Sequence, residues 1–153
     1  MFTISEIIDL AIRVEKNGGK IYSKAQQEVT DTSVASTLEW LAKDEIEHEK
    51  WFMQLKEKLV SNREDPKMEE MARQILQGVL GDRAFSIEEA DFSNLRDLRA
   101  LLELSIEFEE DTVLFYEMLS GFIEDEMVAS QLTLIIEEEK SHARRLKEIL
   151  QAC

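Results

Sequence analysis

Apolar residues recur at alternating steps of three and four along four long stretches of the chain, which is the spacing of one face of an α-helix. The pattern predicts helices over about residues 4–28, 33–61, 94–119 and 124–151. The interval 62–93 differs, because it contains the only proline, Pro66, and a short predicted helix from about Lys67 to Gln77. That interval is too long for a tight turn and suits a crossover between two parallel helices. We therefore expect one all-α domain over residues 1–153, a four-helix bundle with a long crossover between its second and third helices.

Local signals mark the expected helix ends. Thr3 and Glu6 have the spacing of a capping box at the start of the first helix, and the cluster Thr30-Asp31-Thr32-Ser33 precedes the second. The pair Ser120-Gly121 is expected to end the third helix.

Two of the apolar stripes are interrupted at their middle by a glutamate and a histidine. Glu45 and His48 interrupt the apolar stripe of the second helix, and Glu139 and His142 interrupt that of the fourth. A spacing of three residues puts both side chains on one helix face, about one turn apart. A single Glu-x-x-His in a chain rich in glutamate is often a solvated turn. Here the motif occurs twice and uses both histidines of the chain.

The two halves of the chain align without a gap when the sequence is shifted by 94 residues. The shift pairs Glu15 with Glu109, Tyr22 with Tyr116, Asp31 with Asp125, Glu45 with Glu139, and His48 with His142. Chance agreement between amphipathic helices is the alternative, but it does not explain two matched histidines with their glutamates. The repeat selects Glu109 from its acidic neighbours, because it alone is matched by a glutamate in the place of Glu15. We infer two related helical hairpins.

The predicted inward stripes place four carboxylates and two imidazoles in the core. The stripes are Ile8, Ala11, Glu15, Gly18 and Tyr22; Leu38, Leu41, Glu45, His48, Phe52, Leu55 and Leu59; Leu102, Ser105, Glu109, Thr112 and Tyr116; and Leu132, Ile135, Glu139, His142, Leu146, Ile149 and Cys153. Buried charges need compensation, and the stripes contain no lysine or arginine. Bound metal is therefore expected, and carboxylates with few nitrogen ligands and no thiolate suit iron or manganese better than a structural zinc.

Charge and cysteine content narrow the function classes further. The chain has 33 acidic and 18 basic residues, a net charge of −15. Binding to nucleic acid or to an anionic membrane requires clustered lysine and arginine, so neither partner is expected. Cys153 is the single cysteine, which leaves no Cys-x-x-C metal site and suits a reducing compartment. Without a signal-peptide pattern or a long apolar run, we expect a cytoplasmic protein.

With these motifs in order, the chain resembles the rubrerythrin-related, ferritin-like di-iron carboxylate family over essentially its whole length. The resemblance implies a ferritin-like fold and a site for two Fe ions, with Mn or Zn as substitutes. It implies the metal ligands Glu15, Glu45, His48, Glu109, Glu139 and His142. By the same resemblance Glu45 and Glu139 bridge the metals, Glu15 and Glu109 are terminal, and each histidine caps one metal.

The chain departs from rubrerythrin in two respects. The cysteine-ligated rubredoxin domain has no counterpart in this sequence, so the chain is closer to the stand-alone ferritin-like branch. Rubrerythrin also has a second glutamate on its third helix where this chain has Ile106. Since Ile106 cannot bind a metal, we expect a more symmetric site, metals that move little on oxidation, and slower peroxide turnover than in a full rubrerythrin.

Further residues are candidates for roles around the ligands. Tyr22 and Tyr116 suit core packing or electron relay, and Asp44 and Glu138 suit either the surface or a hydrogen bond to the histidine of the other repeat. Gly18 suits either close helix packing or room for an oxidant.

Three functions remain open from the sequence. The first is an oxidoreductase that reacts with peroxide or O2, as in oxidative-stress defence, and takes electrons from an external donor. The second is iron binding, ferroxidation or metal handling without turnover, and the third is a helical interaction module with a vestigial site. A homo-oligomer is expected, with a dimer favoured, and Trp40 and Trp51 are candidates for its interface although core packing is their commoner role.

Overall fold

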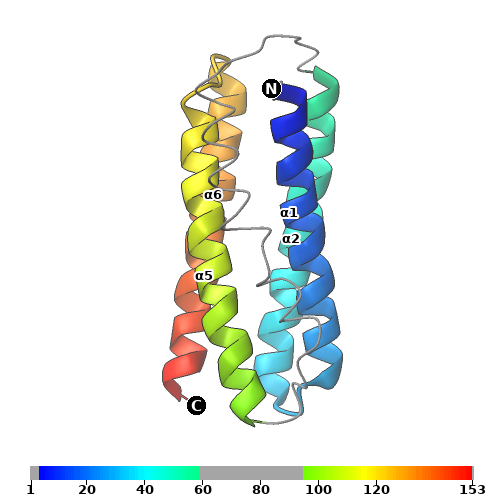
Figure 1. The fold of residues 1–153 in the computed structure, drawn as a ribbon, viewed down its shortest axis with the longest axis vertical. Helices are drawn as coiled ribbons and strands as arrows, with labels where there is room; N and C mark the ends of the chain where they lie inside the picture. The colour runs from blue at the N-terminus through cyan, green and yellow to red at the C-terminus, as the bar shows by residue number, and fades with distance from the viewer. Residues whose placement is uncertain (1–3, 59–94, 153) are drawn as a thin grey trace. The chain divides into compact units, whose positions relative to one another are not determined.

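The structure is a computed structural model that describes residues 4–58 and 95–152. The chain divides into two compact units, Met1–Ser93 and Asn94–Cys153, and the described part of each is one helical hairpin. In the first unit α1 (Ile4–Glu28) packs against α2 (Thr32–Lys58), and in the second α5 (Leu95–Ser120) packs against α6 (Glu126–Ala152). The two helices of each pair run in opposite directions, from blue to green in one hairpin and from green to red in the other (Figure 1).

The bounds of the second and fourth predicted helices follow the internal repeat that the sequence predicted. α2 and α6 each contain 27 residues, and both their first and their last residues are separated by the 94-residue shift. The predicted crossover at 62–93, with Pro66 and its short helix, lies outside the described residues, as do Thr3, Leu59 and Cys153.

The second helix of each hairpin begins directly after an aspartate. Asp31 Oδ1 accepts hydrogen bonds from the backbone N–H groups of Ser33 at 2.9 Å and Val34 at 3.1 Å. Asp125 Oδ1 accepts one from the N–H of Val128 at 3.1 Å. These bonds satisfy N–H groups that have no partner within the helix. Asp125 therefore sets the start of α6 at Glu126, two residues later than the periodicity alone suggested.

Replacing Asp31 by alanine is expected to lower the free energy of unfolding by about 1 kcal/mol, since an N-cap side chain is removed. The urea midpoint of Asp31→Ala against the parent protein measures this loss. The control is Thr30→Ala, because Thr30 is equally exposed and precedes the cap. Equal midpoints for the two variants would show that the Asp31 cap contributes nothing measurable.

The third predicted helix ends where expected, but without a left-handed glycine. α5 ends at Ser120, and the N–H groups of Gly121 and Phe122 donate to the carbonyls of Met118 and Leu119 at 3.1 and 3.0 Å. No described glycine has a positive φ. The last turn of α5 is thus closed by bonds that span three residues.

The four inward stripes predicted from periodicity are confirmed by burial. Every position of those stripes that the structure describes is buried, including the glutamates and histidines at their middle. Several large apolar side chains are exposed instead: Trp40, Ile46, Met53, Leu114, Met118, Met127 and Leu134. The dimer interface predicted around Trp40 and Trp51 stays a prediction. Among the described helices, none combines the length and the apolar character needed to cross a membrane.

Candidate metal centre

The first hairpin brings two carboxylates and one imidazole together in its interior. Glu15 lies on α1, and Glu45 and His48 lie one turn apart on α2, so each side chain follows from the inward stripe of its helix. All three are buried, and His48 Nδ1 lies 3.5 Å from Glu15 Oε2. One ligand atom from each residue lies within 4.8 Å of the other two. This is a spacing that one metal ion between them can span.

The second hairpin repeats the arrangement with Glu109 on α5 and Glu139 and His142 on α6. His142 Nδ1 lies 3.5 Å from both Glu109 Oε1 and Glu139 Oε2. These three side chains are fully buried, and their ligand atoms also lie within 4.8 Å of one another. Each hairpin therefore positions three of the six predicted ligands, with the Nδ1 atom of its histidine facing carboxylate oxygens.

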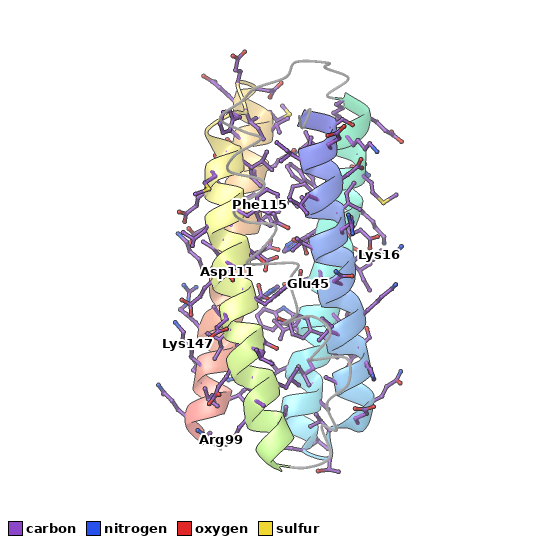
Figure 2. The ribbon with its side chains drawn as sticks, in the orientation of Figure 1. Lys16, Glu45, Arg99, Asp111, Phe115 and Lys147 are labelled. Carbon is purple, nitrogen blue, oxygen red and sulfur yellow. The ribbon has the colours of Figure 1, made fainter. Side chains whose placement is uncertain are left out.

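Apart from the two histidines, no basic side chain is seen to balance the charge of these carboxylates in the described part of the core. Among the residues whose burial the structure describes, every lysine and arginine is exposed or half-buried. Lys16 and Lys147, for example, lie on the outer faces of their hairpins (Figure 2). Burying several carboxylates close together is costly, and a divalent cation would supply compensating positive charge. The donor set of carboxylates and imidazoles fits such a cation chemically.

The pKa of Glu109 shows the cost of this burial. Desolvation raises the pKa of the Glu109 carboxyl from 4.5 to about 8, and the nearby carboxylate of Glu139 adds to the rise. In the absence of a cation, Glu109 therefore retains its proton at neutral pH. Metal binding must displace that proton, so it is coupled to pH.

We expect the metal-free protein to lose stability as the pH rises. Because the pKa of Glu109 is higher in the folded state than the 4.5 of an exposed carboxyl, its contribution to stability is complete below pH 4.5. It is lost progressively as the pH rises through about 8. Urea midpoints of chelator-treated protein between about pH 5 and 9 should fall with pH, and metal-loaded protein should show a weaker dependence. A midpoint that rises with pH in metal-free protein would contradict the shift.

Gly18 explains how Glu45 fits between the two helices of the first hairpin. A Cβ atom at Gly18 would lie 3.2 Å from Glu45 Oε2 and 3.4 Å from its Cδ and Cγ atoms. The backbone of Gly18 has no positive φ, so the conformation itself does not require glycine. The missing side chain gives the Glu45 carboxylate its place against α1, which agrees with the close packing considered from the sequence.

Replacing Gly18 by alanine is expected to weaken metal binding roughly tenfold, since the added Cβ displaces a ligand side chain. The neighbouring Gly19→Ala is the matched control, because its Cβ would meet Ile46 Cγ1 at an ordinary 3.5 Å. Both changes should raise helix propensity by up to about 1 kcal/mol. Metal titration of the two variants isolates the contact with Glu45, and equal affinities would show that this contact does not matter.

The surroundings of Glu15 and Glu109 differ between the two hairpins. Beside Glu15 the inward face of α1 offers Ala11 and Gly18, whereas beside Glu109 the repeat-related positions on α5 are Ser105 and Thr112. Sequence reasoning placed both hydroxyl residues on the inward stripe but gave them no role. The repeat contained the signal, because the 94-residue shift pairs each of them with a residue that lacks a hydroxyl.

The other candidates occupy different environments. Tyr22 and Tyr116 are fully buried in their hairpins, as core packing requires, and Tyr116 contacts Phe115 with ring centroids 5.5 Å apart. Asp44 is half-buried and Glu138 is exposed, and a hydrogen bond that either carboxylate accepts from the N–H of the other repeat's histidine stays a prediction. Ile106, in the place of the additional rubrerythrin glutamate, is buried and apolar.

Comparison with known proteins identifies the family. The sequence model of the Rubrerythrin family matches residues 6–91, which is more than half of the chain and includes the predicted ligands Glu15, Glu45 and His48. The chain belongs to the rubrerythrin family. The second hairpin of this rubrerythrin-family chain carries the repeat-related group Glu109, Glu139 and His142. The resemblance inferred from the sequence is thereby confirmed.

A solved structure confirms the fold. It comes from Thermotoga maritima and is described as a ferritin-like diiron-carboxylate protein. The match has a TM-score of 0.73 and covers 98% of this chain and 95% of the other, with 20% sequence identity. At that identity the likeness establishes the ferritin-like four-helix fold alone. Comparison with curated proteins gave no match.

Proposed function

We propose that this rubrerythrin-family protein holds two metal ions, with iron as the native metal, and uses them for redox chemistry with peroxide or O2. Glu15, Glu45 and His48 are the proposed ligands from the first hairpin, and Glu109, Glu139 and His142 those from the second. The observation that carries the proposal is that each hairpin buries two carboxylates and an imidazole whose ligand atoms lie within 4.8 Å of one another. Membership of the rubrerythrin family supports it.

The side chains have distinct tasks in this proposal. His48 and His142 bind through Nδ1, because that atom faces the carboxylate oxygens in each hairpin. The carboxylates neutralise the added charge, and their burial keeps bulk water from the reacting ligand. Glu109 releases its proton when metal enters. Iron held by such ligands supplies one-electron redox changes at each ion, and two ions together match the two-electron reduction of peroxide.

The electrons are proposed to come from an external donor. The sequence has one cysteine, too few for the thiolate ligands of an iron–sulfur centre in this sequence. The proposed partners are a small-molecule oxidant, an external reductant and a second copy of the chain. Manganese or zinc would fit the same donor atoms, and zinc would give a site without redox activity.

Metal analysis combined with an optical spectrum tests the proposal. Protein purified without added metal is expected to contain about two iron ions per chain, on the ligand count of the di-iron bundle proteins. One equivalent of peroxide should take two electrons from the reduced two-iron centre and produce the spectrum of the oxidised protein. An external reductant should then restore the spectrum of the reduced protein, and this cycle should be repeatable. Oxidation of added Fe²⁺ without repeated peroxide consumption would favour iron handling instead. A chain that binds no metal would leave the interaction-module alternative.

A further inference from the structure

The hydroxyl of Ser105 is a buried polar group in the second hairpin. Ser105 is 1% exposed on the inward face of α5. Among the residues that the structure describes, its Oγ atom has no hydrogen-bond partner. Buried hydroxyls are normally satisfied, and one that is not carries a desolvation cost. Ser105 therefore presents an unused hydrogen-bonding group in the interior of the second hairpin.

Three other hydroxyls on the helices form a hydrogen bond within their helix that Ser105 lacks. Thr37, Thr112 and Thr133 each donate a hydrogen bond to the carbonyl oxygen four residues earlier, at 3.1, 2.7 and 2.9 Å. This is the usual way for a helix to satisfy a serine or threonine. Thr112, on the same face as Ser105, has its hydroxyl committed in this way. The Ser105 hydroxyl therefore remains available to donate into the interior.

The position of Ser105 places this hydroxyl beside the ligand group. Ser105 precedes Glu109 by four residues, so the two are neighbours on one helix face. Helical side chains lean towards the N-terminus, which carries the Glu109 side chain over the turn that contains Ser105. The repeat-related position in the first hairpin is Ala11, which has no hydrogen-bonding group. The feature is thus specific to the second hairpin.

We propose that Ser105 donates a hydrogen bond to a small monoanion, of the class to which azide and hydroperoxide belong, bound beside Glu109 and His142. Ser105 is a positioning and specificity residue in this role, and it makes the two hairpins unequal although their ligands match. The inference rests on the proposed function, because the monoanion needs the bound metal as its principal partner. It extends that function by specifying which hairpin binds the small ligand and which side chain orients the ligand.

Azide is the probe, because it is a small monoanion whose binding to ferric iron changes the visible spectrum. Optical titration of iron-loaded, oxidised Ser105→Ala should give an azide dissociation constant about five- to tenfold larger than that of the parent, the loss expected for one hydrogen bond. Iron content should be unchanged. Thr37→Val is the control, since it removes a buried hydroxyl that bonds only within α2, and its azide constant should stay within about twofold of the parent's.

Thermal unfolding of the metal-free protein provides a second readout. If Ser105 has no protein partner, metal-free Ser105→Ala should melt no lower than the parent. A clearly lower melting temperature would show a structural hydrogen bond and overturn the inference, as would an unchanged azide constant or a loss of iron from this variant. If the parent chain binds no metal, direct metal analysis shows it, and the proposed function and this inference fail together. Full iron content with an unchanged azide constant overturns this inference alone.

Discussion

Replacing Glu139 by leucine is expected to remove most of the bound metal and to make the metal-free protein more stable. Leucine has a similar volume but cannot bind a cation. It also removes the carboxylate that raises the pKa of its neighbour Glu109. Exchanging a fully buried carboxyl group for an apolar side chain removes its desolvation cost, and this should raise the free energy of unfolding of the metal-free protein by on the order of 1–3 kcal/mol. Opposite effects on binding and on stability are characteristic of a site kept for function.

Metal content after purification and urea unfolding after chelation measure the two effects separately. The matched control is Glu137→Ala, on the same helix but exposed, where Glu137 pairs only with Lys140 at 3.4 Å. Surface pairs of this kind contribute little, so both quantities should remain at the parent's values. His48→Ala, which removes a proposed ligand of the other hairpin, should also lose metal. Full metal content in Glu139→Leu would contradict the assignment of Glu139 as a ligand.

Chelation should lower the melting temperature of the parent protein by roughly 6–16 °C. A ligand present at 100 to 1,000 times its dissociation constant stabilises the folded state by about 3–4 kcal/mol. For a chain of this size, each kcal/mol corresponds to about 2–4 °C. Differential scanning calorimetry before and after chelation, followed by addition of Fe²⁺, measures the shift and its reversal.

The same chelation applied to Glu139→Leu is the control for this measurement. That variant should melt at nearly the same temperature with and without chelator, since it has little metal to lose. If the parent also shows no shift, its carboxylates are held in some other way, and the role of metal as the compensating charge would have to be abandoned.

Helix periodicity and the internal repeat were sufficient to predict the core positions. The spacing from Leu38 to Leu55 is continuous over five turns, and no described position of that stripe is exposed. The 94-residue shift separated Glu109 from Glu107 and Glu110, and the structure leaves these two exposed. A long amphipathic helix repeats its signal at every turn, so single deviations do not obscure it.

Features that depend on distances between side chains could not be read from the sequence. The contact between Gly18 and Glu45 depends on how closely α1 approaches α2, and periodicity does not contain that distance. The start of α6 depends on the hydrogen bond that Asp125 Oδ1 accepts from the Val128 N–H, and helix periodicity does not contain that contact. Ser105 lies on a stripe that was predicted correctly, but whether its hydroxyl has a partner becomes apparent only in three dimensions.

The equal division of the proposed ligand residues between the hairpins has an evolutionary consequence. A gene for one hairpin of this kind would already encode a glutamate and a Glu-x-x-His motif, so two copies of its product would carry all six donor residues. Duplication and fusion of such a gene would account for the equal lengths of α2 and α6 and for the aspartate that caps each of them. Two joined copies could then diverge beside the donors, as Ala11 and Ser105 differ here.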